Sequence, residues 1–224
     1  MRASSQLPLP LPSRCSFSRA DLIVAAANER AVAFIEAWPD WPVRIAALYG
    51  PPGCGKTHLI SIWRQMSGAG IVSAGEIAGR ASHLGEILAI EDVDSADASP
   101  ARDEALFGLI ESGTGSILFT GRTPPAAWAC ALPDLASRFS SLTAVALQAP
   151  DEALLAALAR KLLCDRQLFV PDAIIEAMLR RLDRSAAAIR GFVEELDAAA
   201  LAKGSPVSGA LVRNLIAARE AGAP

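Results

Sequence analysis

A chain of 224 residues that is 52% hydrophobic and 20% charged can bury a core of its own, which excludes a disordered tail. Its formal net charge of -3 and its isoelectric point near 5.5 lack the basic excess that a phosphate backbone requires, so we expect no direct sequence-specific DNA binding. Every apolar run is much shorter than the roughly 20 residues that span a bilayer, and the first dozen residues alternate Leu and Pro instead of forming a signal sequence, so we expect a cytoplasmic protein without a membrane partner.

The first half of the chain alternates predicted strands with predicted helices. Residues 1–20 are rich in Pro, Ser and Arg, which is typical of an extended tail. The Ala-rich stretch at 21–38 predicts an amphipathic helix that Pro39 ends. Short apolar runs then predict strands at 45–49, 70–73, 87–90, 116–120 and 142–147. This alternation is typical of a parallel α/β sheet.

The pattern becomes wholly helical after Pro150. Apolar residues recur at spacings of three and four over 151–168, 171–182, 185–202 and 207–218. We therefore expect a tail at 1–20, an α/β domain at 21–149 and a small helical domain at 150–224.

A phosphate-binding motif lies between a predicted strand and a predicted helix. Residues 50–57, Gly-Pro-Pro-Gly-Cys-Gly-Lys-Thr, fit G-x-x-x-x-G-K-[ST] in full. The glycines let backbone N–H groups converge on the phosphates, the lysine reaches the β and γ oxygens, and the threonine hydroxyl ligates Mg²⁺. The sequence thus predicts ADP or ATP with Mg²⁺. The nucleotide-binding candidates are Gly50, Pro51, Pro52, Gly53, Cys54, Gly55, Lys56, Thr57 and His58, although packing or solvent explains the histidine as readily.

Two acids end the predicted strand at 87–90. Glu91 is a candidate metal ligand together with Thr57, and Asp92 is a candidate catalytic residue that orients a nucleophilic water. Glu91 stands where an aspartate is usual, and its extra methylene shifts the metal position.

These motifs resemble the AAA+ ATPases of the DnaA-related clade. Three further stretches, at 117–125, 132–139 and 181–197, are similar to the Hda proteins, the regulatory inactivators of DnaA. The resemblance covers nearly the whole chain. It implies an AAA+ P-loop domain with a five-stranded parallel sheet, followed by a helical lid domain and by no DNA-reading module.

The resemblance also implies a function and partners. The Hda proteins convert ATP-bound DnaA to the ADP-bound form while docked on the DNA sliding clamp, which prevents re-initiation. Within AAA+ proteins the arginine of the 132–139 stretch is a finger presented to a neighbouring subunit's nucleotide, and Arg138 matches it. Without the resemblance, the sequence is equally consistent with Arg138 being a surface residue in a salt bridge. The chain itself is expected to be at most a weak ATPase.

The N-terminal tail carries a second specific feature. Residues 6–11 match the clamp-binding hexapeptide Q-L-x-L-P-L at each specified position. A Pro-rich segment has little conformational entropy left to lose when its leucines enter an apolar pocket. Leu-Pro repeats also occur in ordinary linkers. The candidate partner-binding residues are Gln6, Leu7, Leu9, Pro10 and Leu11.

The resemblance also implies a nucleotide-sensing position in the helical domain and a set of adenine-contacting residues. The lid arginine that senses the nucleotide phosphates aligns with Ala187, and either Arg184 or Arg190, each three residues away, could substitute for it. The resemblance places adenine recognition before the sheet, at Ile23, Val24 and Asn28.

Other functions remain open for these residues. A self-sufficient AAA+ ATPase, such as a helicase or clamp loader, would use Lys56, Asp92 and Arg138 within a homo-oligomer. A small P-loop kinase is a third alternative, in which the helical region and the 132–139 stretch have no role.

Overall fold

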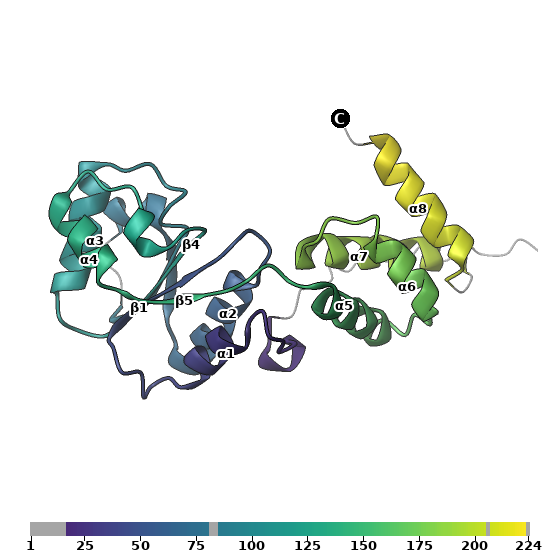
Figure 1. Cartoon of the computed structure of the whole chain (residues 1–224), viewed down its shortest axis with the longest axis horizontal. Coiled ribbons are helices and arrows are strands. Elements are labelled where there is room, and N and C mark those ends of the chain that lie inside the picture. The colour runs from purple at the N-terminus through teal and green to yellow at the C-terminus, as the bar shows by residue number, and fades with distance from the viewer. Residues whose placement is uncertain (1–16, 81–84, 205–206, 223–224) are drawn as a thin grey trace, which may run out of the picture. The chain divides into compact units, whose positions relative to one another are not determined.

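The computed structural model describes residues 17–80, 85–204 and 207–222. The chain divides into two compact units, one of them Phe17–Ala149 and the other containing Pro150–Pro224. The first is an α/β unit and the second is helical throughout its described part (Figure 1).

The α/β unit is built on one parallel sheet with strand order β2-β3-β4-β1-β5. The strands are β1 (Ile45–Tyr49), β2 (Gly70–Ser73), β3 (Ile87–Glu91), β4 (Ser116–Gly121) and β5 (Thr143–Ala146). This confirms the predicted five-stranded parallel sheet. In the register, Tyr49 at the end of β1 pairs with Gly121 and with Ala146, so the carboxyl ends of three strands meet at one edge.

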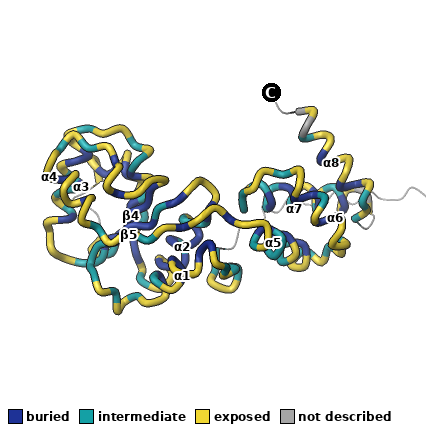
Figure 2. The backbone as a smooth tube through the Cα atoms, viewed as in Figure 1, coloured by how far each residue is buried: buried dark blue, intermediate teal, exposed yellow. Residues whose placement is uncertain are grey.

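Helices cover both faces of the sheet (Figure 1). On one side lie α1 (Glu29–Glu36) and α2 (Lys56–Ser67), and on the other lie α3 (Pro100–Glu111) and α4 (Pro133–Ser140). Strand β1 contributes side chains to the hydrophobic core on each face of the sheet. Ala46 and Leu48 belong to the core that includes α1 and α2, and Ala47 belongs to the core that includes α3 and α4. The three inner strands, β1, β3 and β4, are accordingly the most buried strands of the sheet, while the edge strands β2 and β5 are largely exposed (Figure 2).

The helix predicted at 21–38 is wrong for its first half. A 3₁₀ turn at Arg19–Asp21 is followed by non-helical backbone, and α1 begins only at Glu29. The side chain of Asn28 donates to the Ile23 carbonyl (2.9 Å) and accepts from the Ala25 amide (2.8 Å). These bonds give the backbone an alternative to helical pairing, which is how asparagine ends or delays a helix.

The described part of the second unit contains four helices. They are α5 (Glu152–Asp165), α6 (Asp172–Leu179), α7 (Ala186–Lys203) and α8 (Gly209–Gly222). Helix α5 packs against α6 and α7, and α8 packs against the same two helices. Asp151 and Ser185 cap α5 and α7 by accepting from the amides of Leu154 and Ala188. Among the described residues, no helix is both long and apolar enough to cross a membrane.

Candidate functional site

The loop at 50–57 joins β1 to α2 and lies tightly against the sheet edge. A Cβ atom on Gly50 would come within 2.2 Å of the Leu147 carbonyl oxygen, so only glycine fits there. Gly55 precedes the first residue of α2 and has a left-handed backbone with φ of 106°, which disfavours other residues. The two glycines therefore let the bare backbone form the surface in front of α2.

Lys56 folds back over this loop. Its Nζ donates to the carbonyl oxygens of Gly50 (2.7 Å) and Pro51 (3.3 Å) and lies 3.9 Å from the Cys54 Sγ. Burial raises the pKa of the Cys54 thiol, and the nearby ammonium of Lys56 only partly offsets this rise. Cys54 is thus a neutral thiol that fills the inside of the loop, while Lys56 supplies the positive charge at its surface.

Thr57 and Glu91 are brought together from the start of α2 and the end of β3. The Thr57 side chain lies close enough to the Glu91 carboxyl to influence its pKa. Burial raises the pKa of Glu91 above its ordinary value, the charge of Asp92 raises it further, and the nearby Thr57 side chain partly offsets the rise. One hydroxyl and one partly buried carboxyl therefore face each other directly beside the glycine-rich loop.

The turn after β3 is held by β4. Asp92 has a left-handed backbone with φ of 55°, and its amide donates to the Thr120 Oγ1 (3.2 Å). Asp94 accepts from the amides of Arg122 (2.7 Å) and Thr123 (2.8 Å), which ties the loop after β4 to the same turn. The sequence offered no sign of this role for Asp94, because an acid in a polar loop usually faces solvent.

Glu91 provides a test of this environment through folding stability. Its carboxyl has a raised pKa in the folded chain, so its favourable contribution to folding is complete below its ordinary value of 4.5 and is lost as the pH rises through the raised value. We expect Glu91→Gln to match the wild type in free energy of unfolding near about pH 4 and to exceed it at about pH 7.5. Urea unfolding at both pH values, without Mg²⁺ or nucleotide, measures the difference. A variant less stable than the wild type at the higher pH would contradict the assignment.

Arg138 lies in the last turn of α4, at the surface of the α/β unit. Its Nη2 is 2.9 Å from the Oε1 of Glu111, the last residue of α3, and the two side chains are 51% and 43% exposed. Ion pairs this exposed contribute at most about 1 kcal/mol. The guanidinium can therefore leave Glu111 for another anion at little cost.

The residues expected to contact adenine lie in the segment just before α1. The two bonds of Asn28 fix the backbone from Ile23 to Ala25, and the Val24 side chain is left 45% exposed. Asn28 itself is 7% exposed, so it shapes the segment instead of offering a free side chain.

His58 has a packing role in the structure. It is 5% exposed, its Nε2 lies 3.0 Å from the Ser18 carbonyl oxygen, and its ring meets Phe17 edge to face. The ring therefore anchors the segment before η1 (Arg19–Asp21) on α2.

The candidate sensor residues lie in the helical unit. Ala187 is the second residue of α7 and is exposed. Arg184 precedes Ser185, the residue that caps α7, so the helical spacing argument applies to Arg190 and not to Arg184. The expected clamp-binding residues 6–11 lie outside the described residues.

The donor set at the loop fits a magnesium nucleotide. Mg²⁺ takes oxygen ligands and is commonly held by one or two protein groups together with substrate phosphates. Thr57 and Glu91 offer such oxygens, and the backbone in front of α2 offers N–H groups. Within the described part of the chain, no cluster of three His, Cys, Asp or Glu side chains could hold a metal by itself. Phosphate oxygens and water would complete the coordination.

Comparisons with known proteins identify the fold. No protein-family model and no curated protein matches the chain. Its structure is similar to domain III of the replication initiation protein DnaA from Thermotoga maritima, with a TM-score of 0.76 and 19% identity over 90% of this chain and 96% of that chain. AMPPCP-bound DnaA from Aquifex aeolicus gives a TM-score of 0.66 and 18% identity over 78% of this chain and 63% of that chain.

A branch migration motor shows the same likeness. The RuvB protein of Thermotoga maritima matches with a TM-score of 0.69 and 18% identity, over 89% of this chain and 70% of that chain. The chain therefore has the AAA+ fold, an α/β unit with a five-stranded parallel sheet followed by a helical region. Within that class the fold is DnaA-like. The chain spans less than two thirds of the Aquifex protein.

Proposed function

We propose that this chain is a regulatory AAA+ protein that binds an adenine nucleotide and inactivates DnaA by stimulating the hydrolysis of DnaA-bound ATP. In this proposal the chain is attached to the DNA sliding clamp through residues 6–11 and presents Arg138 to the nucleotide of DnaA. Its own turnover is slow, and re-initiation is prevented because DnaA is left in its ADP form.

The observation that supports the proposal most strongly is the exposure and weak pairing of Arg138. The side chain is half-exposed at the end of a short helix, and the exposed carboxylate of Glu111 is a weak partner for it. A guanidinium that is to stabilise charge on another protein's phosphate must be reachable and readily released. A buried Arg138 bonded on every side would have excluded this function.

The chain's own loop would hold a nucleotide with the residues described above. The backbone at 50–55 and Lys56 would bind the phosphates, and Thr57 with Glu91 would hold the metal. Bound Mg²⁺ would neutralise phosphate charge. Asp92, beside Glu91 at the sheet edge, would orient water. One similar structure is described as DnaA bound to AMPPCP and single-stranded DNA, which favours an adenine nucleotide at the corresponding loop.

A self-sufficient motor is the second candidate, because the RuvB branch migration motor has the same fold. A motor needs the same Arg138 in a homo-oligomer and would hydrolyse ATP without DnaA. The two functions therefore differ in whose nucleotide is consumed.

Hydrolysis measured in four mixtures separates these candidates. The mixtures contain the chain alone, the chain with DnaA, DnaA with DNA-loaded clamp, and all three components. We expect rapid hydrolysis only in the complete mixture, with a rate set by the amount of ATP-bound DnaA. Equal hydrolysis by the chain alone would support the motor and contradict the regulatory function.

A tail variant tests the clamp attachment in the same assay. A tether raises the effective concentration of the chain without adding catalytic groups. Leu7→Ala with Leu11→Ala should therefore raise the concentration of chain needed for half-maximal stimulation and leave the maximal rate unchanged.

A further inference from the structure

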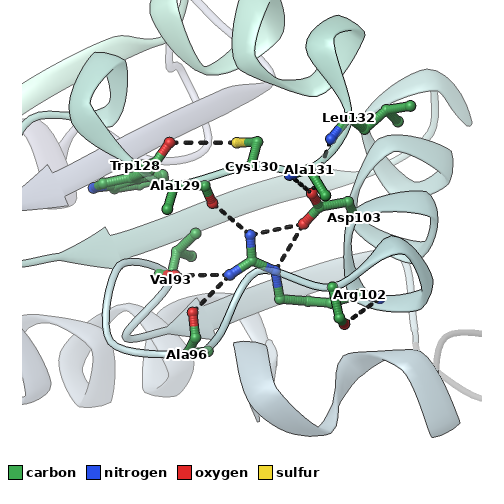
Figure 3. Close-up of polar contacts among 10 residues, drawn as sticks. Val93, Ala96, Arg102, Asp103, Trp128, Ala129, Cys130, Ala131 and Leu132 are labelled. Atoms are coloured by element: carbon green, nitrogen blue, oxygen red, sulfur yellow. Dashed lines mark hydrogen bonds and ion pairs between the residues drawn. The ribbon is translucent and has the colours of Figure 1, made fainter.

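Arg102 and Asp103 form a buried ion pair near the start of α3 (Figure 3). Their side chains are 3% and 0% exposed. Charged side chains are rarely buried this deeply unless they are paired, and they cost free energy when they are removed from water. Such a pair needs a reason beyond filling the core.

Each nitrogen of the Arg102 guanidinium has a hydrogen-bond partner. Nε donates to the Oδ1 of Asp103 (2.8 Å), and Nη2 lies 2.7 Å from the same oxygen in the ion pair. Nη1 donates to the carbonyl oxygens of Ala96 (2.8 Å) and Val93 (3.4 Å), in the turn that follows β3. Nη2 also donates to the Ala129 carbonyl (2.7 Å), in the segment that leads into α4. Because the guanidinium is a rigid planar fork, it holds these segments in one mutual arrangement (Figure 3).

The other carboxylate oxygen of Asp103 fixes the beginning of α4. Its Oδ2 accepts from the amides of Ala131 (2.5 Å) and Leu132 (3.2 Å). Leu132 is the residue that precedes the first turn of α4, whose backbone N–H groups attract negative charge. Asp103 is therefore an N-terminal anchor supplied by a neighbouring helix.

Helix α3 thus contacts α4 at both ends, but it holds α4 firmly only at the start. Asp103 binds that start, and Glu111 forms the weak, exposed pair with Arg138 in the last turn. Between them Leu135 and Phe139 are buried in the core. An eight-residue helix is about 12 Å long and its backbone hydrogen bonds connect its turns, so a shift at its start would change the position of Arg138.

We infer that Arg102 and Asp103 are positioning residues that set where Arg138 projects from α4. This inference rests on the proposed function, because the position of Arg138 matters for stimulation only if DnaA is its target. Both side chains are buried, so they would act through α4 and not by direct contact with the nucleotide of DnaA. Their effect is on the maximal stimulated rate, since a misplaced guanidinium binds the developing charge less well while docking is unchanged.

A contribution to stability alone would explain the pair less well. Replacing a buried ion pair by apolar residues of similar volume is often neutral or stabilising. A pair that served only to fill the core could therefore be exchanged for apolar side chains without any change in the stimulated rate. The two explanations make opposite predictions for a doubly apolar variant.

The test compares Arg102→Met/Asp103→Leu with the wild type. Two quantities are measured: stimulated hydrolysis of DnaA-bound ATP as a function of chain concentration, and amide hydrogen exchange of α4 in the chain alone. We expect the maximal stimulated rate to fall at least tenfold at an unchanged half-saturating concentration, and the α4 amides to exchange at least tenfold faster. Arg102→Lys, which keeps the charge without the planar fork, should give an intermediate loss and keeps the test valid if the double variant does not fold.

Ile35→Val is the control for stability, because Ile35 is fully buried in the core on the opposite side of the sheet. Reduced stability lowers the folded fraction and so shifts the half-saturating concentration, but it leaves the maximal rate unchanged. Wild-type maximal rate and wild-type α4 exchange in the folded variants would overturn the inference. If the wild-type chain does not stimulate DnaA at all, the proposed function fails, and the exchange of α4 alone then decides whether the pair holds the helix.

Discussion

Replacing Arg138 by alanine is expected to lower the maximal rate of hydrolysis of DnaA-bound ATP by about 10³-fold or more. A guanidinium at the γ-phosphate stabilises charge that develops in the transition state, and alanine has nothing to replace it. Stability should barely change, because the exposed pair with Glu111 is worth at most about 1 kcal/mol. Single-turnover hydrolysis of ATP preloaded on DnaA, with saturating chain and DNA-loaded clamp, measures the effect.

The helical unit offers a matched control for this variant. Arg160 is 50% exposed and its Nε lies 2.8 Å from an Asp172 carboxylate oxygen, so Arg160→Ala removes an equally exposed arginine from an equally simple ion pair. We expect it to leave stimulation unchanged. Arg138→Lys keeps the charge without the planar fork and should fall between alanine and the wild type. Full stimulation by Arg138→Ala would mean that another group supplies the charge, and the proposed function would then fail.

The phosphate loop and the sheet could be predicted because their signals are local. Residues 50–57 carry their own backbone requirements, and the buried strands are short apolar runs bounded by polar residues. The strand at 87–90 and the acids that follow it placed Glu91 beside the loop, where the structure brings it to Thr57. In a parallel sheet the carboxyl ends of all strands lie at the same edge, which is why the end of β3 could be expected near the loop that follows β1.

The anchoring of α4 could not be predicted in the same way. Arg102 and Asp103 are adjacent charged residues in a helix, a pattern that usually indicates a solvated face. Their burial depends on carbonyl and amide groups at 93–96 and 129–132, which no sequence spacing connects to α3. The helix prediction at 21–28 was wrong for a related reason. The Asn28 side chain bonds backbone groups of Ile23 and Ala25, which the Ala-rich pattern had assigned to a helix.

Replacing Gly50 by alanine is expected to have the second largest effect, on nucleotide affinity. The added Cβ would lie 2.2 Å from the Leu147 carbonyl oxygen, and no side-chain rotation relieves a clash with backbone. The Leu147 amide is itself bonded to the Tyr49 carbonyl at 2.7 Å, so the end of β5 cannot withdraw freely. The loop must shift instead. Loss of about two charge-assisted hydrogen bonds to phosphate, at roughly 1.5 kcal/mol each, lowers affinity about 100-fold.

Calorimetric titration with ADP and ATP, together with thermal unfolding, checks this expectation. Overpacking at Gly50 should cost about 1–3 kcal/mol and lower Tm by several degrees. Gly108→Ala is the matched control: Gly108 is an exposed residue within α3, and an added Cβ meets no atom within 4 Å. That change should raise stability by about 0.5–1 kcal/mol, because glycine is unfavourable inside a helix, and leave nucleotide affinity unchanged. Wild-type affinity in Gly50→Ala would show that the loop binds phosphate in another way, because the close approach of Gly50 to Leu147 is what sets its shape.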